Sequence, residues 1–433
     1  MRNALWIIAA GLILSACGGG GGGSSGGGAT VTPPTLTNFA SVTVDAGPAA
    51  VNTGPNAYIS DDAPFVSVTI CAPGSTTNCQ TIDHVLVDTG SVGLRIAQSV
   101  LNSSLLSALP SQMDASSSPV GECYGFVDGY VFGSVRSADF QIGGESVSGM
   151  PLQLIGDGGA FANPPSSCSS GGGTSLSTVQ EIGANGIIGI GVTTTDCGSL
   201  CETAGGYSAA IYYDCPTSGC SSIITRNAST SAPFQQLPNP VAAMGVDNNG
   251  TILELPTVPP SGEISATGTL YFGIGTQANN GLGAQSILTT TNSNSPYGPG
   301  LLTAAYKGQT LPESFIDSGS NAYYFIDSTI ALCAQAGFAG FYCPSSPLSL
   351  GPTLSGSNGV SASAAFTLYN AYTLLEGTNS AAAGIGANPN AITNADFYPN
   401  SFDFGLPFFF GRNVYTALEG RSAGTTVGPY MAF

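Results

Sequence analysis

Hydrophobic residues along this chain come in short runs that are separated by glycine and small polar residues. Residues 65–70 alternate between apolar and polar, which predicts a β-strand, and residues 82–87 predict a second strand that ends at Asp88. Residues 121–131 contain glycine and tyrosine in an order that fits a hairpin, and residues 140–144 predict a strand followed by a turn. Short apolar runs with turn residues between them predict an all-β fold.

The order of these predicted elements repeats in the second half of the chain. Residues 268–273 predict a strand, and Phe315 and Ile316 lead into Asp317 as residues 82–87 lead into Asp88. Each half has a later apolar run that contains glycine, at residues 185–191 and 402–411. We therefore expect an internal duplication, with one lobe over residues 40–258 and a second over residues 259–433. The best helix candidate is residues 328–337.

Composition narrows the possible functions. The 433 residues carry seven Lys and Arg against 25 Asp and Glu, a net charge of −18, which disfavours nucleic acid as a partner. His84 is the only histidine, so the chain lacks a histidine cluster for a metal, and its position beside the Asp88 strand disfavours Ser-His-Asp catalysis. A phosphate-binding Gly-Lys loop is also missing from the sequence. We expect a monomer that needs no cofactor and no metal.

The first residues predict export. Met1 and Arg2 precede an apolar stretch, residues 4–14, that is too short to cross a bilayer. Residues 14–17, Leu-Ser-Ala-Cys, resemble the lipobox of bacterial lipoproteins, which implies a signal peptide over residues 1–17 and lipidation of Cys17. Residues 18–39 then form a flexible linker. Gly18 is not aspartate, which by the same resemblance favours a lipid anchor in the outer membrane of a Gram-negative bacterium. The alternative is an ordinary secretory signal with a chance cysteine.

Cysteine usage fits an oxidising compartment. Without Cys17 the count is even, which in an exported chain predicts disulfides. The expected pairs are Cys71 with Cys79, Cys333 with Cys343, Cys123 with Cys168, and two bridges among Cys197, Cys201, Cys215 and Cys220 in a Gly/Ser-rich insertion. A zinc site is the alternative for the last four.

Two tetrapeptides carry the candidate chemistry. They are Asp88-Thr89-Gly90-Ser91 and, 229 positions later, Asp317-Ser318-Gly319-Ser320. Two carboxyl groups held close together cannot both ionise, so they share one proton and can act as base and acid on a water molecule and a carbonyl group. A single Asp-x-Gly could be an ordinary turn, but its repetition after two matching strands favours a shared centre.

These residues resemble the pepsin-like aspartic peptidases. Ile187-Ile188-Gly189 and Phe404-Gly405 are similar to the later apolar-glycine elements of that family, and Tyr124, or alternatively Tyr130, to its flap tyrosine. The resemblance implies an all-β, bilobal double barrel with a cleft that binds an extended peptide or unfolded protein segment. It further implies catalysis by Asp88 and Asp317 and support of this dyad by the neighbouring residues Thr89, Gly90, Ser91, Ser318, Gly319 and Ser320.

Two departures from the family pattern leave other functions open. Arg95 stands where the family carries a tryptophan, and it either lowers the pKa of Asp88 or points to solvent. Asp403 stands where the pattern has an apolar residue. The main hypothesis is a membrane-anchored aspartic endopeptidase, and the alternative is an inactive binding or surface-structural lipoprotein. A third hypothesis, an adhesin-like β-sandwich with chance motifs, predicts that the two aspartates lie far apart.

Overall fold

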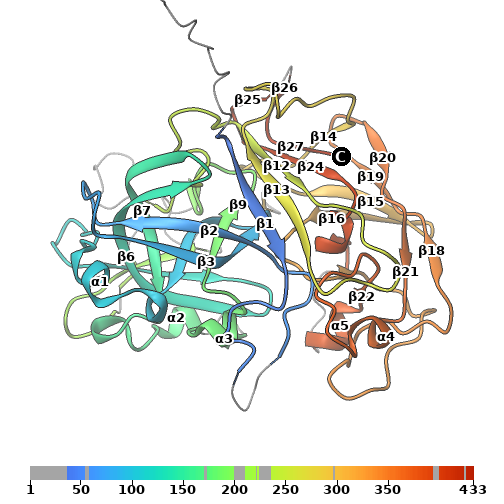
Figure 1. Ribbon diagram of the computed structural model, residues 1–433, viewed down its shortest axis with the longest axis horizontal. Helices are drawn as coiled ribbons and strands as arrows, with labels where there is room; N and C mark the ends of the chain where they lie inside the picture. The colour runs from blue at the N-terminus through green and yellow to red at the C-terminus, as the bar shows by residue number, and fades with distance from the viewer. Residues whose placement is uncertain are drawn as a thin grey trace, which may run out of the picture. The chain divides into compact units, whose positions relative to one another are not determined.

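The computed structural model describes residues 37–53, 58–169, 173–198, 210–220, 222–223, 236–295, 298–393, 399–423 and 426–433. The predicted signal peptide, Cys17, most of the linker and Cys201 lie outside these ranges. The chain is mostly β (Figure 1), so the predicted all-β fold is confirmed. No described helix is long and apolar enough to cross a membrane.

Six strands of the N-terminal lobe close into a barrel, drawn blue to green in Figure 1. They pair in the order β6–β7–β4–β9–β3–β2 and back to β6. Their bounds are β2 Pro64–Cys71, β3 Cys79–Asp88, β4 Val92–Ala97, β6 Gly129–Ile142, β7 Glu145–Ile155 and β9 Gly186–Ile190. All residues of β4 and β9 are buried, because these strands lie inside the barrel wall with neighbours on both sides.

The same three-strand arrangement presents both aspartates. In the N-terminal lobe β9 lies between β3 and β4, parallel to the first and antiparallel to the second. In the C-terminal lobe β23 (Asp403–Phe404) lies between β16 (Gln309–Ile316) and β17 (Tyr323–Tyr324) with the same directions. The same strand directions therefore occur around both aspartates.

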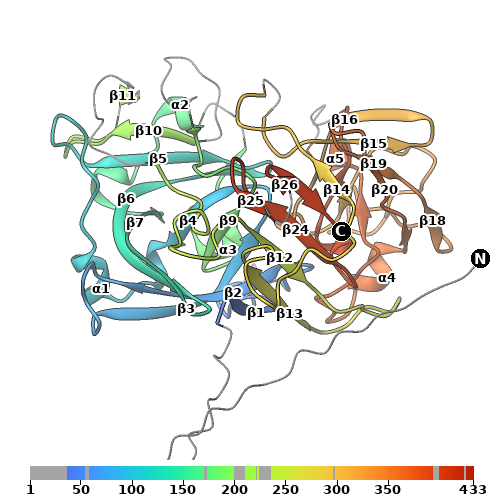
Figure 2. The same ribbon diagram turned by 90° about the horizontal axis from the view of Figure 1, so that it is seen from above.

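One large sheet continues from the barrel into strands near both ends of the described chain. After β2 its order is β1, β13, β12, β24, β27 and β14 (Figure 2). These strands are β1 Phe39–Val44, β12 Gly250–Glu254, β13 Ala266–Phe272, β14 Ile287–Thr289, β24 Asn413–Ala417 and β27 Tyr430–Ala432. Strand β1 pairs with β13 over its whole length, so the segment directly after the linker is part of the folded body.

The remaining strands extend the two lobes. At the other end of the large sheet lie β5 Val120–Gly125, β10 Ala210–Asp214 and β11 Ser222–Ile223, and β8 Thr174–Ser175 pairs with β6. A seven-stranded sheet of the C-terminal lobe adds β15 Leu302–Tyr306, β19 Thr353–Ser355, β20 Ser361–Ser363 and β22 Gly386–Ala387 to β16, β23 and β17. Two small sheets pair β18 Leu348–Leu350 with β21 Phe366–Leu368, and β25 Ser422–Ala423 with β26 Thr426–Val427.

The helices are short. They are α1 Ser103–Ala108, α2 Ser166–Ser169, α3 Val179–Ile182, α4 Ala371–Leu375 and α5 Pro389–Thr393, with 3₁₀ turns η1 Gln98–Val100, η2 Gly159–Phe161 and η4 Leu406–Phe408. The helix predicted at residues 328–337 is wrong. Leu332 instead forms a β-bridge with Tyr342, next to the disulfide between Cys333 and Cys343. Tertiary pairing outweighs local propensity in so short a segment.

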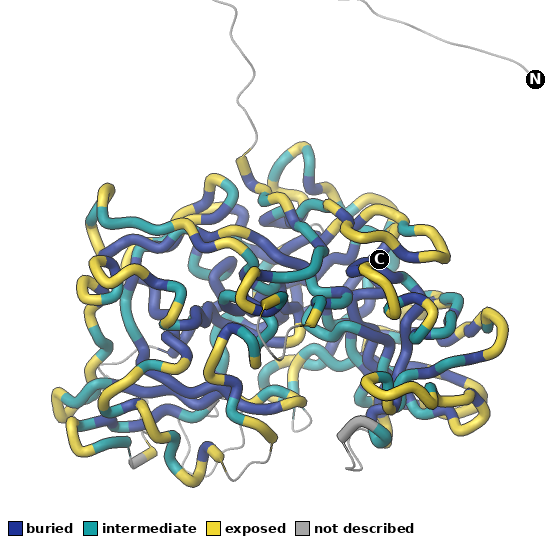
Figure 3. Tube along the Cα trace, turned by 60° about the horizontal axis from the view of Figure 1, so that its bottom comes forward, coloured by how far each residue is buried: buried dark blue, intermediate teal, exposed yellow. Residues whose placement is uncertain are grey.

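The core follows the strands, and exposed residues gather at the turns between them (Figure 3). In the C-terminal lobe the core is aromatic. Phe402 stacks on Phe325 and Phe404 with ring centroids 4.6 and 4.4 Å apart, and all three side chains are fully buried. This packing fixes the strand that carries Asp403 between β16 and β17.

Three disulfides join the predicted partners, and a fourth lies within the predicted Gly/Ser-rich insertion. Cys71 pairs with Cys79, Cys123 with Cys168 and Cys333 with Cys343. Within the insertion Cys215 pairs with Cys220, and Cys197 is also disulfide-bonded. The zinc alternative is wrong for these sulfurs, because a disulfide sulfur is no longer a thiolate ligand.

Candidate active site

Asp88 and Asp317 meet where the two lobes touch. Each lies at the end of its apolar strand, and each is packed against the glycine of the other motif. A Cβ atom on Gly90 would lie 2.6 Å from Asp317 Cγ, and one on Gly319 would lie 2.9 Å from Asp88 Cγ. The two carboxyl groups lie close enough together for the charge of Asp88 to raise the pKa of Asp317. The β-sandwich hypothesis, which needs distant aspartates, is therefore wrong.

Thr89 and Ser318 cross-link the two loops in a reciprocal way. The backbone N–H of Thr89 donates to Ser318 Oγ at 3.1 Å, and the N–H of Ser318 donates to Thr89 Oγ1 at 2.9 Å. Each hydroxyl then donates onward to the other lobe, Ser318 to Val87 O at 2.7 Å and Thr89 to Ile316 O at 3.4 Å. These bonds hold the two carboxyl groups in a fixed relation.

Replacing Ser318 by alanine is expected to lower the free energy of unfolding by about 2–3 kcal/mol, because Val87 O and Thr89 N would lose their partner in a buried place. Ser318 is fully buried. Urea unfolding of the variant measures the loss, and exposed Ser349→Ala, on β18, is the matched control. A loss no larger than that of the control would contradict the assigned bonds.

The two carboxyl groups have different surroundings. Asp88 accepts three hydrogen bonds, from the N–H of Gly90 at 2.8 Å, from the N–H of Ser91 at 3.0 Å and from the Ser91 hydroxyl. Asp317 accepts from the N–H of Gly319 at 2.8 Å and from the Ser320 hydroxyl at 3.1 Å. Burial, the charge of Asp88 and then the charge of Asp403 raise the Asp317 pKa well above its usual range. A shared proton therefore resides on Asp317, because Asp88 has more donors to stabilise its charge.

The pair is partly accessible to solvent. Asp88 is 5% exposed, while Gly90 is exposed and Asp317 and Gly319 are partly so. A small molecule or a backbone carbonyl can therefore approach the carboxyl groups over the two glycines.

A hairpin formed by β5 and β6 lies close to Asp88. Tyr124 is on β5 and 6% exposed, and burial raises its pKa, as does the charge of Asp88. At the hairpin turn, partial burial and the charge of Asp88 raise the pKa of Asp128. Tyr130 packs in a separate cluster around Cys123 and Cys168. Of the two tyrosines considered for the flap, Tyr124 is the one whose pKa is raised by the charge of Asp88.

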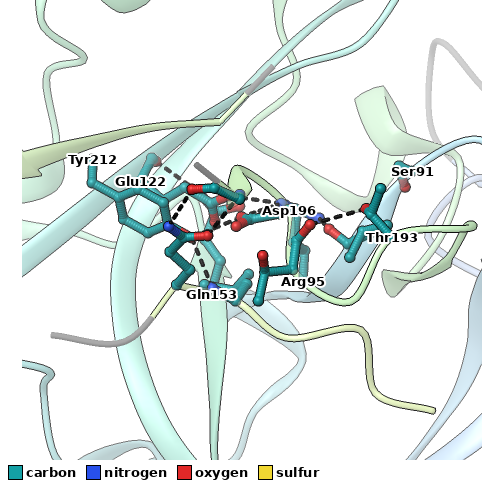
Figure 4. A network of polar contacts seen from close by, with 12 residues as sticks. Ser91, Arg95, Glu122, Gln153, Thr193, Asp196 and Tyr212 are labelled. Carbon is teal, nitrogen blue, oxygen red and sulfur yellow. Dashed lines mark hydrogen bonds and ion pairs between the residues drawn. The ribbon is translucent and has the colours of Figure 1, made fainter. Parts of the chain in front are cut away.

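Arg95 stands at the centre of a buried ionic network (Figure 4). Its Nη2 lies 2.6 Å from Glu122 Oε1 and 3.3 Å from Asp196 Oδ2, and all three side chains are fully buried. The guanidinium carbon also lies 3.7 Å from the centre of the Tyr124 ring. The expectation that Arg95 points to solvent is wrong, since its side chain is fully buried. It anchors the hairpin strand to β4 through Glu122 and Tyr124.

Asp196 and Tyr212, which flank part of the Gly/Ser-rich insertion, complete the network. Asp196 accepts a hydrogen bond from the Tyr212 hydroxyl at 2.7 Å, and Gln153 Nε2 donates to Glu122 O at 2.7 Å. Burial and the neighbouring Glu122 raise the Asp196 pKa well above its usual range. Strand β10, which carries Tyr212, pairs with β5 along its whole length. The insertion therefore stiffens the hairpin.

Sequence reasoning missed Glu122, Asp196 and Tyr212. A signal existed for Glu122, which stands alone among the apolar and glycine residues of 120–125, where an unpaired charge is costly. Asp196 and Tyr212 carried no such signal, because their partners are distant along the chain.

Comparison with known proteins gave a match to a family model and matches among solved structures. A family model described as "Protein of unknown function (DUF3443)" matches residues 34–433. The comparison with curated proteins found no match. Among solved structures, the aspartic proteinase from Irpex lacteus aligns over 91% of this chain and 96% of its own, with 14% identity and a TM-score of 0.46.

Proposed function

Because the chain belongs to the DUF3443 family, whose description names no activity, we propose its function from the site itself: an aspartic-type endopeptidase that uses Asp88 and Asp317. The observation that carries this proposal is the close carboxyl pair, in which each aspartate packs against the glycine of the opposite motif. Among the residues that the structure describes, no basic side chain forms an ion pair with either carboxyl group, although a purely structural pair of buried acids would call for one.

The geometry assigns different roles to the two groups. Ionised Asp88 takes a proton from a water molecule, whose oxygen attacks the peptide carbonyl carbon, while Asp317 gives its proton to the carbonyl oxygen. The resulting diol collapses when the C–N bond breaks. One hydroxyl proton returns to Asp317, and the proton on Asp88 passes to the leaving nitrogen. Each carboxyl group ends in its starting state.

The substrate in this proposal is an extended peptide or an unfolded protein segment. The exposed glycines leave room for a main chain, and the β5–β6 hairpin lies beside Asp88. An extended chain can pair with strand edges in such a site. The disulfides fit an exported protein in an oxidising compartment. Attachment to a membrane through a lipid on Cys17 remains part of the proposal.

The test is hydrolysis of a carboxymethylated, unfolded protein by the purified full chain between pH 3 and pH 7. We expect cleavage that a statine-containing peptide inhibits, because statine mimics the tetrahedral intermediate. The double variant Asp88→Asn, Asp317→Asn, purified in the same way, controls for a contaminating protease. Absence of cleavage over the whole pH range, or equal cleavage by the double variant, would refute the proposal.

A second candidate function is an inactive binding protein. The observation that favours it is the clamped hairpin, since Arg95 and β10 hold Tyr124 in a buried position that limits its movement. This alternative predicts that the statine peptide raises the melting temperature while the wild-type chain cleaves no substrate.

A further inference from the structure

Asp403 is an acid, whereas the corresponding position of the N-terminal lobe carries an apolar residue. In the N-terminal lobe the central strand carries Ile187, which pairs with Leu86 on β3 and Arg95 on β4. In the C-terminal lobe the corresponding residue is Asp403, which pairs with Phe315 on β16 and Tyr324 on β17. The two lobes therefore differ at the same point beside their aspartates.

The strand register directs Asp403 towards the dyad. Side chains alternate along a strand, so Phe315 and Asp317 point to the same face of the sheet. Asp403 pairs with Phe315 and shares that face, while Phe404 and Ile316 point into the core. The N–H of Asp317 donates to Phe404 O at 3.1 Å, which holds the two strands together at this point.

The Asp403 carboxyl group is buried and incompletely satisfied. The residue is 7% exposed, and its Oδ1 atom is buried with no hydrogen-bond partner among the described residues. The groups that interact with it are Asp317 and Ser320 of the second motif, Asp88 from β3 and Tyr324 from β17, and Asp128 of the hairpin also acts on Tyr324. None of these groups is a cation. A structural role would call for a base or a full set of donors around this carboxyl group.

We propose that Asp403 is a third carboxyl group of the active site, which acts on Asp317 to keep the shared proton on the dyad at higher pH. This inference rests on the proposed function. Ser320 donates to Asp317 Oδ2 at 3.1 Å and also interacts with Asp403, so the second motif lies between the two acids. Once Asp403 has lost its own proton, its negative charge opposes ionisation of Asp317 and preserves the form with one shared proton. Asp403 is thus a positioning residue for the proton and does not touch the substrate.

The activity test compares pH profiles of kcat/KM for wild type, Asp403→Asn and Asp403→Ile, the last of which restores the residue of the other lobe. Removal of the charge lets Asp317 lose its proton more easily, so the alkaline limb is expected to move to lower pH by about one unit. Glu313→Gln, on the neighbouring strand β16 and with the same change of charge, is the matched control and leaves the limb in place. An unmoved limb in both Asp403 variants would overturn the proposal.

A second measurement does not depend on activity. Burial raises the pKa of Asp403 above its value in the unfolded chain, so its contribution to stability is present in acid and is lost as pH rises through the folded pKa. Asp403→Asn is therefore expected to raise the melting temperature at pH 7 by about 2–4 °C and to change it little at pH 3. Equal effects at both pH values would overturn the placement of Asp403. Absence of cleavage by wild type together with the expected melting shift would refute only the proposed function.

Discussion

Replacing Asp88 by asparagine is expected to reduce kcat/KM for peptide hydrolysis by about 10³–10⁴-fold, because the water molecule would lose its base. The amide keeps the size of the side chain and can still meet the donors of Gly90 and Ser91. The loss should therefore appear in kcat, with KM for an extended peptide little changed. Steady-state kinetics at the pH optimum of the wild type measures both constants.

The companion variant Asp317→Asn separates the two roles. It removes the proton donor to the carbonyl oxygen, and we expect a loss of similar size, also in kcat. Both folded variants should still bind a statine-containing peptide, which calorimetry can detect. A variant that retained more than a tenth of the wild-type activity would show that the residue is not part of the chemistry. Circular dichroism of both variants checks that the loss is not caused by unfolding.

Replacing Arg95 by methionine is expected to lower the free energy of unfolding by about 3–5 kcal/mol, the largest loss that we expect from one substitution. Methionine fills much of the same volume, but Glu122 and Asp196 would be left buried without their cation. Burial by itself would lower the pKa of Arg95, yet the charges of Glu122 and Asp196 raise it, so the guanidinium stays charged in the folded protein. Urea unfolding of the variant measures the loss.

Two further variants define the cause of that loss. Arg136→Met breaks the ion pair with Asp157, whose partners are 20% and 12% exposed, and it should cost about 1 kcal/mol or less. The double variant Arg95→Met, Glu122→Gln should lose less than Arg95→Met alone, because the amide needs no cation. If the double variant lost more, the coupling of Arg95 to Glu122 would be refuted. The Arg95 variant should also raise KM, since Tyr124 would lose the guanidinium beneath its ring.

Much of the site was predictable from local sequence. The motifs around Asp88 and Asp317 each combine an apolar strand, an acid and a glycine, and these features depend only on neighbouring residues. The two glycine-containing runs were predicted as matching later elements of the two halves, and they form β9 and β23, which lie beside the acid-bearing strands. The disulfides between near neighbours could also be predicted, because a short loop leaves few other partners.

Local sequence patterns gave the wrong secondary structure for residues 328–337. The composition of this segment suits a helix, but the bridge from Leu332 to Tyr342 depends on pairing across a turn. The ionic network also depends on contacts between distant parts of the chain, because Arg95 and Asp196 are 101 positions apart. A sequence pattern can show that Arg95 is unusual, but it cannot show which acids will surround it.

Local sequence patterns were enough to predict an all-β chain in which each half carries one aspartate at the end of a strand. Alternation of side chains along strands and the special geometry of glycine are local properties, so they can be recognised in the sequence. Only the tertiary structure decided that Arg95 is buried against Glu122 and Asp196, and that Asp403 faces the dyad. Those contacts follow from strand register and from the desolvation of charges, and both exist only once distant segments have packed together.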